Sequence, residues 1–177
     1  VGQSLFDAYS VAFPKAKFLV WNRTHERALY MVKNKSNAVA VENLEAGVKR
    51  ADIITCATMS KQPIIKGEWL IPGQHLDLIG AYRPDMREVD DLALCRSTKF
   101  VDSYDTTLDH IGELKIPLKN NVISRADILA DFYGLGNFIR RSNDEITFFK
   151  NGGGAHLDLI FAKYILTAWE KNKYPNS

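Results

Sequence analysis

The chain has 177 residues, the size of one ordinary globular domain, and 46% of them are hydrophobic, which supports a sizeable core and argues against disorder. Its 23 basic and 21 acidic residues are interspersed and leave a net charge of +2, so no basic surface for nucleic acid is expected. No apolar run is long enough to cross a bilayer and no signal-peptide pattern is visible, so the sequence predicts no membrane association.

The first predicted element is a helix that starts at Gly2 and places Leu5, Phe6 and Tyr9 on one face. The distance from Gly2 to Asn22 matches the run from the last glycine of a GxGxxG phosphate loop to the end of the following strand. We therefore expect the chain to begin inside such a loop, with Gly2 as a cofactor contact. On this interpretation the first strand and first glycines belong to a missing N-terminal part, and the chain is a fragment of a longer protein.

The next predicted strand, residues 18–21, is a short apolar run followed by the polar sequence Asn22-Arg23-Thr24 and then by a helix. In a doubly wound nucleotide-binding unit, residues at this strand end bind the adenosine ribose of the cofactor. An acidic residue there binds the 2′-hydroxyl, whereas an arginine accommodates a 2′-phosphate. Arg23 offers a planar guanidinium for two parallel hydrogen bonds to phosphate, and Thr24 offers a further donor. The segment predicts NADP(H) in preference to NAD(H), which stays possible if Arg23 is only a solvated residue.

The remaining elements follow from hydrophobic periodicity and turn signals along the chain. The expected strands are residues 38–41, 52–58, 75–81, 99–103 and 145–150. The expected helices are residues 24–33, 42–50, 85–96, 106–114, 125–133 and 155–171. Strands that alternate with helices are typical of an α/β protein with a parallel sheet.

The segment 52–58 is continuously apolar between polar residues, as expected for a strand that is buried on both faces. It ends in the small residues Ala57 and Thr58. Ligands of open α/β sheets lie outside the carboxyl ends of the strands, where small side chains let the backbone approach a cofactor. Ala57 and Thr58 are therefore candidate cofactor contacts, with a plain turn after the strand as the alternative.

The most charged stretch of the chain, residues 82–91, directly follows the predicted strand 75–81. Asp85 has the position of a cap for the helix 85–96, and Glu88 completes a spacing that resembles a capping box. Capping does not account for Arg83, which precedes a proline and is free to point into a cleft. Arg83 is accordingly the candidate catalytic residue, as a cation for a substrate carboxylate.

The last predicted strand, residues 145–150, runs into Gly152, Gly153 and Gly154, and the helix 155–171 follows with an apolar stripe. Glycines between a strand and a helix allow a ligand to approach the backbone at the positive end of the helix. A flexible hinge would need the same glycines, so both interpretations stay open at this point.

Side chains that could carry chemistry without a cofactor are sparse. Cys56 and Cys95 lie in apolar surroundings without a CxxC pattern, so both are expected to be reduced core residues, as in a cytoplasmic protein. The histidines lack metal-ligand spacing and no nucleophile motif of the GxSxG type occurs, so neither a metal site nor a catalytic serine is predicted. These exclusions leave a cofactor-driven reaction.

Several sequence blocks that occur together and in order carry a family resemblance. They read VWNRTHERA, ADIITCAT, GEWLIPGQHLDLIGA, YRPDMREVDD, FVDS and ITFFKNGGGAHLD, and they span nearly the whole chain. Because these blocks occur together and in this order, the chain resembles the ornithine cyclodeaminase and mu-crystallin family of dinucleotide-binding proteins. The resemblance implies a doubly wound, Rossmann-type α/β domain that lacks its first strand and most of the glycine loop.

Within this family the chain looks most like the ketimine reductase branch, whose substrates are Δ1-pyrroline-2-carboxylate and Δ1-piperideine-2-carboxylate. Ornithine cyclodeaminases carry a catalytic aspartate two residues after the glycine that corresponds to Gly80, and the family's alanine dehydrogenases tend to do so, whereas this chain has Tyr82. The resemblance therefore implies NADPH-dependent reduction of the C=N bond of cyclic imino acids. The alternatives are cyclodeaminase or alanine dehydrogenase activity, and a mu-crystallin-like protein that binds NADPH and a hydrophobic hormone-like ligand.

The resemblance also implies how the cofactor and the domains are arranged. It places NADPH contacts at Asn22, Arg23, Thr24, Ala57, Thr58, Ala81 and Gly153. It divides the chain into a truncated dinucleotide-binding domain, residues 1–144, and a segment, residues 145–177, whose helix returns to a missing N-terminal domain. That domain would supply the main substrate residues and a homodimer interface, and it would cover the apolar stripe of the helix 155–171, which is otherwise partly exposed.

Overall fold

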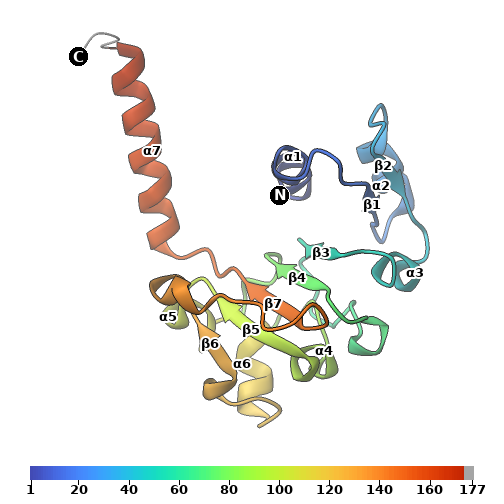
Figure 1. Cartoon of the computed structure of the whole chain (residues 1–177), viewed down its shortest axis with the longest axis vertical. Coiled ribbons are helices and arrows are strands. Elements are labelled where there is room, and N and C mark those ends of the chain that lie inside the picture. Colours follow the sequence, from blue (N-terminus) through green and yellow to red (C-terminus); the bar gives the residue numbers. More distant parts are fainter. Residues whose placement is uncertain (174–177) are drawn as a thin grey trace.

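The computed structural model describes residues 1–173 and shows strands and helices that alternate along most of the sequence (Figure 1). The strands are β1 (Phe18–Val20), β2 (Ala38–Ala40), β3 (Ile53–Cys56), β4 (His75–Leu78), β5 (Ser97–Val101), β6 (Ile128–Ala130) and β7 (Ile146–Lys150). The α-helices are α1 (Gly2–Ala12), α2 (His25–Val32), α3 (Leu44–Val48), α4 (Asp91–Arg96), α5 (Tyr104–Thr107), α6 (Gly112–Lys119) and α7 (Ala155–Lys173). Short 3₁₀ helices are η1 (Gly67–Trp69), η2 (Arg125–Asp127) and η3 (Phe132–Asn137).

The strands are arranged in two parallel sheets. Strands β1 and β2 pair with each other, whereas β3, β4, β7, β5 and β6 form, in this order, a five-stranded sheet. Because every pairing is parallel, the carboxyl ends of the five strands lie along one edge of their sheet. The arrangement confirms the predicted Rossmann-type α/β fold. Strand β7 is the last strand in the sequence, but it lies between β4 and β5 in the sheet. Within the segment that begins at residue 145, β7 is therefore part of the sheet, and only α7 lies outside it.

One face of the five-stranded sheet carries the hydrophobic core, which α4 and α6 help to close. The core includes Ile54, Cys56, Leu76, Leu78, Leu94, Val101, Leu114 and Phe148. Cys56, Leu78, Lys150 and Val101 are in register across neighbouring strands at the carboxyl end of this face. A fully buried lysine therefore occupies one position in a row of apolar residues.

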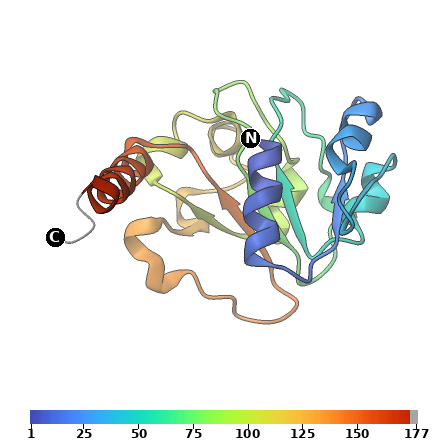
Figure 2. The same cartoon turned by 90° about the horizontal axis from the view of Figure 1, so that it is seen from above.

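Helix α1 connects the two sheets (Figure 2). Its Phe6 ring lies 4.5 Å from the ring of Phe18 in β1, measured between centroids. Its Tyr9 hydroxyl donates a hydrogen bond of 2.7 Å to the carboxylate of Asp77 in β4, and Thr55 in β3 donates one of 2.8 Å to the same oxygen. These contacts hold the β1–β2 sheet against the five-stranded sheet.

Removing the Tyr9 hydroxyl tests this connection. Burial raises the pKa of Tyr9, so the hydroxyl stays a donor throughout the neutral range. Tyr9→Phe is expected to lower the free energy of unfolding by about 1–2 kcal/mol, because the Asp77 carboxylate loses a hydrogen bond. Urea unfolding measures the change, with Tyr30→Phe at an exposed position of α2 as the control. An equal change in both variants would contradict the role of this bond.

Strand β3 and one cysteine differ from the predictions. Ile54 is buried, but Ile53 and Thr55 are exposed, because β3 is an edge strand with only one face in the core. The expectation of a strand buried on both faces is therefore wrong. Both cysteines are free, as expected, and Cys56 is buried, but Cys95 is exposed on the outer face of α4 rather than in the core.

The predicted helix over residues 85–96 is wrong for its first half. Residues 82–89 form a loop, and the helix begins only at α4, where the Asp90 side chain accepts a hydrogen bond of 2.9 Å from the Ala93 N–H. The true cap is therefore Asp90 rather than Asp85. The local spacing predicted the cap five residues too early, because both positions carry an aspartate.

Two further predicted helices are replaced by other structure. The range 106–114 contains the end of α5 and the start of α6, because Ile111 adopts an extended conformation (φ −106°, ψ 126°) between them. The range 125–133 contains η2, strand β6 and the start of η3. Ile128 and Ala130 are buried where β6 pairs with β5, so tertiary pairing overrides the local helical pattern.

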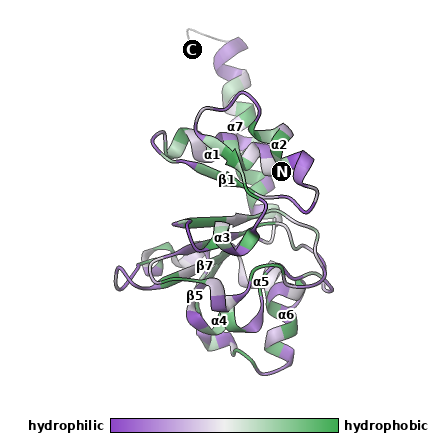
Figure 3. Cartoon of the chain, turned by 90° about the vertical axis from the view of Figure 1, so that its right-hand side faces the viewer, coloured by the Kyte–Doolittle hydropathy of each residue, from purple (hydrophilic) through white to green (hydrophobic). Residues whose placement is uncertain are grey.

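Helix α7 stands out from the body (Figure 1), and the hydropathy colouring marks hydrophobic stretches along its ribbon (Figure 3). Side chains that are more than half exposed are Leu159, Ile160, Phe161, Tyr164, Ile165, Leu166 and Trp169. The exposure of this stripe confirms the expectation from the sequence. Among residues 1–173, no helix combines the length and apolar character needed to cross a membrane.

Candidate cofactor site

A buried carboxylate links the turns that follow β3 and β4. Glu88 is fully buried, and its Oε1 accepts hydrogen bonds from the Thr58 N–H (2.7 Å) and the Thr58 hydroxyl (2.8 Å). Its Oε2 accepts from the N–H groups of Gly80 (2.9 Å) and Ala81 (3.2 Å). One side chain thus holds the carboxyl ends of two neighbouring strands in a fixed relation.

Gly80 has to be a glycine for this contact to form. A Cβ at this position would lie 2.1 Å from the Thr58 carbonyl oxygen and 2.3 Å from the Oε1 of Glu88. Real Cβ atoms do not approach backbone or carboxylate oxygens this closely. The glycine therefore allows the turn after β4 to lie against the turn after β3.

A second buried carboxylate holds the backbone of the first. Glu113, in α6, is fully buried and accepts hydrogen bonds from the N–H of Glu88 (2.7 Å) and the N–H of Val89 (3.1 Å). Burial raises the pKa of Glu113 to about 7, although the two backbone donors favour its ionised form. The loop that carries Glu88 is therefore anchored on α6.

Lys150 supplies the positive charge beside these carboxylates. Its ammonium group is fully buried at the end of β7 and donates to the carbonyl oxygens of Leu78 (3.1 Å) and Asn151 (2.8 Å). Burial lowers the pKa of Lys150, and the negative charges of Glu88 and Glu113 oppose that shift. The lysine thereby joins the end of β4 to the end of β7 and balances part of the buried negative charge.

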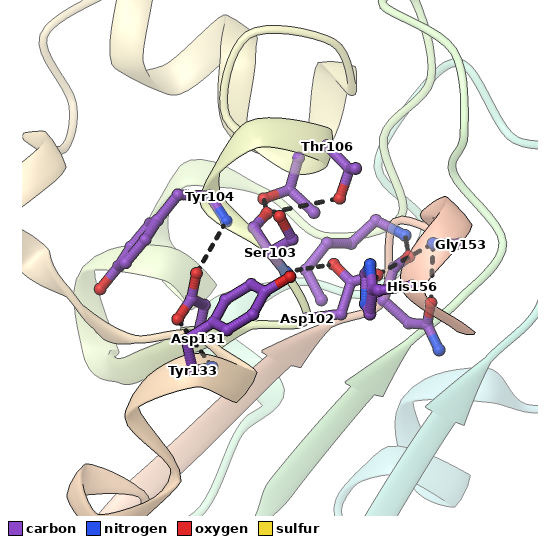
Figure 4. Close-up of polar contacts among 11 residues, drawn as sticks. Asp102, Ser103, Tyr104, Thr106, Asp131, Tyr133, Gly153 and His156 are labelled. Carbon is purple, nitrogen blue, oxygen red and sulfur yellow. Dashed lines mark hydrogen bonds and ion pairs between the residues drawn. The ribbon is translucent and has the colours of Figure 1, made fainter. Parts of the chain in front are cut away.

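Asp102, directly after β5, organises the glycine turn that follows β7 (Figure 4). This fully buried carboxylate accepts hydrogen bonds from the N–H of Ser103 (2.8 Å) and the N–H of Gly153 (3.0 Å). The Nε2 of His156, in the first turn of α7, lies 3.9 Å from the same carboxylate. Gly153 has a φ of +71°, which favours glycine, and no atom lies within 4 Å of the place where a Cβ would stand. Its backbone is therefore open to a ligand.

The end of β1 lies in the other sheet and presents free polar groups. The Asn22 side chain accepts a hydrogen bond of 2.9 Å from the N–H of Thr24, which caps α2 without using its hydroxyl. Arg23 is exposed, and its guanidinium makes no hydrogen bond or ion pair within residues 1–173. The Trp21 indole donates to the carbonyl oxygen of Glu42 at 3.2 Å and so ties this strand end to the segment after β2. Arg23 and Thr24 are thus available for an anion.

The structure joins some of the predicted site residues and leaves others apart. Thr58 and Ala81 both donate to Glu88, and Lys150 connects the end of β4 to the turn that contains Gly153. Within residues 1–173, no hydrogen bond or ion pair joins the end of β1 to these turns. Gly2, the first residue of α1, is exposed with open space around it.

Three predicted residues occupy settings that the sequence did not indicate. Ala57 is half-buried, whereas the whole of Ala81 is buried beside Met86 and Ile111, and its N–H donates to Glu88, so Ala81 offers no exposed atom to a ligand. Arg83 is half exposed, and its Nε lies 3.3 Å from Asp85, which also pairs with Lys61 at 2.9 Å. Arg83 is therefore paired with Asp85 in this conformation, and its role as a cation for a substrate carboxylate stays a prediction.

Sequence reasoning missed Glu113, Lys150 and Asp102, and it assigned Glu88 only a capping role. A usable signal existed for two of them: Lys150 is the last residue of β7 and Asp102 directly follows β5, so both are charged residues at the carboxyl ends of strands. Other chemistry is not indicated. Burial raises the pKa of the Cys56 thiol, and no cluster of His, Cys, Asp or Glu in the described part of the chain could hold a metal ion.

A parallel sheet that alternates with helices and carries glycine turns at its strand ends is typical of a Rossmann-type α/β domain. The sequence model of the ornithine cyclodeaminase/mu-crystallin family matches residues 6–173, and the chain belongs to this family.

Similar proteins agree with this assignment. The Δ1-pyrroline-2-carboxylate reductase of Paracoccus denitrificans (strain Pd 1222) is 46% identical over 93% of this chain and 55% of its own length. The ketimine reductase mu-crystallin of Mus musculus is 33% identical over 96% of this chain and 53% of its own length. The solved structure of Thermococcus litoralis Δ1-pyrroline-2-carboxylate reductase in complex with NADH and L-proline has a TM-score of 0.85 and 29% identity, covering 92% of this chain and 53% of that one. The chain spans about half the length of the curated relatives it matches.

Proposed function

We propose that this chain is the cofactor-binding part of a reductase that uses NADPH to reduce the C=N bond of cyclic imino acids, giving proline or pipecolate. The observation that carries the proposal is the likeness to the Paracoccus reductase along nearly the whole chain. Tyr82, exposed after β4, supports a reductase because cyclodeaminases carry an aspartate at this position. NADPH rather than NADH is proposed from the unpaired Arg23 at the end of β1.

The residues of the site fit a dinucleotide. Arg23 and Thr24 offer charged and neutral donors to a 2′-phosphate, and the open backbone at Gly153 admits a planar ring. When bound, the cofactor supplies a hydride to the imine carbon, and the ring nitrogen of the substrate takes up one proton. The chain itself has to hold the strand ends in place, which Glu88 and Lys150 do. A cation for the substrate carboxylate and a proton source complete the requirements.

We further propose that an N-terminal part outside this chain completes the protein. Strands β1 and β3 each pair on one side only, so an added strand between them would join the two sheets. The same part would supply the first glycines, the main cation for the substrate carboxylate, the cover of the α7 stripe and the interface of a homodimer. The free thiols support a cytoplasmic location.

The test is NADPH oxidation by the full-length protein with Δ1-piperideine-2-carboxylate. The wild type is expected to prefer NADPH to NADH, and Arg23→Ala is expected to reduce that preference by about tenfold or more, as the loss of a charge-assisted contact to phosphate predicts. Arg50→Ala, at an exposed position shortly before the amino end of β3, is the control for loss of charge.

Each result bears on one part of the proposal. An unchanged cofactor preference in Arg23→Ala would contradict the assignment of the 2′-phosphate site but not the reaction. An inert ketimine together with tight NADPH binding would contradict the reductase. In that case oxidation or cyclisation of an amino acid, or simple binding of NADPH and a small hydrophobic ligand, would take its place.

A further inference from the structure

We propose that Glu88 is a positioning residue for cofactor binding, which sets the shape of the surface that the turns after β3 and β4 present to the nicotinamide end of the dinucleotide. The inference rests on the proposed function, because it assumes that a nicotinamide cofactor lies at these strand ends. It assigns a role to a carboxylate that itself touches no ligand.

The hydrogen-bond pattern uses both side-chain oxygens of Glu88 as acceptors. Both oxygens of Glu88 accept two hydrogen bonds each, and all four donors come from Thr58, Gly80 and Ala81. A carboxylate accepts through both oxygens, whereas the amide of a glutamine has one oxygen and an NH₂ group that would face further donors. Glutamine therefore cannot hold both turns, although it has nearly the same size and shape.

The same pattern determines which groups remain for a ligand. The N–H groups of Thr58, Gly80 and Ala81 and the Thr58 hydroxyl all point to Glu88, so none of them is available to an anion. Phosphates bind where such donors are free. These turns therefore suit the uncharged carboxamide and ring of a nicotinamide rather than the pyrophosphate. Thr58 thus acts by holding its turn and does not donate a hydrogen bond to the cofactor.

The surroundings of Glu88 hold its side chain and backbone in a fixed position. Its backbone N–H is held by Glu113, its carboxylate lies against Gly80 where no Cβ fits, and it is fully buried. The turn after β4 is further tied to β7 by the ammonium group of Lys150, which bonds the carbonyl oxygen of Leu78. Pre-organised backbone of this kind lowers the entropy lost when a ligand binds.

The experiment measures NADPH binding by fluorescence titration of the full-length protein, beside its thermal unfolding. Glu88→Gln is expected to raise the dissociation constant for NADPH by about tenfold or more, at a temperature where circular dichroism shows the variant to be folded. Thr58→Val removes only one of the four donors and is expected to raise the dissociation constant for NADPH by about threefold. This variant still tests the inference if Glu88→Gln does not fold. Glu170→Gln, at an exposed position of α7, is the control.

The outcomes separate positioning from stability alone. A lower unfolding temperature with an unchanged dissociation constant, in Glu88→Gln or in Thr58→Val, would mean that Glu88 only stabilises the fold and would overturn the inference. Weaker NADPH binding in both variants, in the order stated, would support it even if the wild type fails to reduce the ketimine. A wild type that binds neither NADPH nor NADH would overturn the proposed function, and this role with it.

Discussion

Lys150→Met is expected to lower the free energy of unfolding of the protein by about 3–5 kcal/mol, the range for removing one partner of a buried group of charges. The ammonium group is fully buried and donates to two backbone carbonyl oxygens. The charges that favour its ionised form are those of Glu88, Glu113, Asp102 and Asp77. Methionine fills a similar volume but leaves the carbonyl oxygens of Leu78 and Asn151 without this donor and the carboxylates without a counter-charge. Two separate penalties therefore add.

Urea unfolding of the full-length protein at neutral pH measures this loss, with Lys119→Met, at an exposed position of α6, as the control. A double variant, Lys150→Met with Glu113→Gln, should lose less than the sum of the two single losses, because one of the carboxylates left without a counter-charge is then gone. A loss below about 1 kcal/mol for Lys150→Met would show that the buried carboxylates do not depend on this lysine.

The elements that the sequence predicted best are those whose pattern is local. Helices α1 and α7 and strands β1, β2, β4 and β7 follow from apolar periodicity and from turn residues at their ends. The strand end at Asn22, Arg23 and Thr24 was found for the same reason, because a polar cluster directly follows a short apolar run. Such signals need no knowledge of which segments meet in space.

The network around Glu88 was missed because its partners are distant in sequence. Glu88 is 30 residues from Thr58, and Glu113 is 25 residues from Glu88. From the sequence alone, the spacing of Asp85 and Glu88 looks like a helix cap, and a cap explains both residues without chemistry. Only the parallel packing of β3 beside β4 brings the two turns within reach of one carboxylate.

Strand β6 and the position of β7 in the sheet could not be predicted for the same reason, because both depend on contacts between segments that are distant in sequence. The segment that contains β6 has a helical pattern, and it becomes a strand because Ile128 and Ala130 are buried beside β5. The insertion of the last strand between β4 and β5 places Lys150 at the centre of the strand ends. Sheet order is a property of the whole chain, and no local pattern specifies it.

The free energy of unfolding should depend on pH because the pKa of Glu113 differs between the folded and the unfolded protein. The carboxyl has an ordinary pKa of 4.5 and a pKa of about 7 in the fold, raised by burial. As the pH rises from 4.5 to 7, the unfolded chain releases this proton before the folded protein does, so the free energy of unfolding falls. About 2.5 pH units separate the two pKa values, which corresponds to a loss of roughly 3 kcal/mol from this group.

Glu113→Gln removes the titration and is therefore expected to flatten the profile between pH 5 and 8, as measured by urea unfolding at about four pH values. His75 opposes this slope in the wild type, because burial lowers its pKa and favours the folded state as the pH rises. The difference between wild type and variant isolates Glu113, since His75 is common to both. Parallel profiles would mean that the N–H groups of Glu88 and Val89 offset the burial of Glu113 and keep it ionised in the fold. In that case Glu113 would hold a full negative charge beside Lys150 at neutral pH, and the loss expected for Lys150→Met would lie at the upper end of its range.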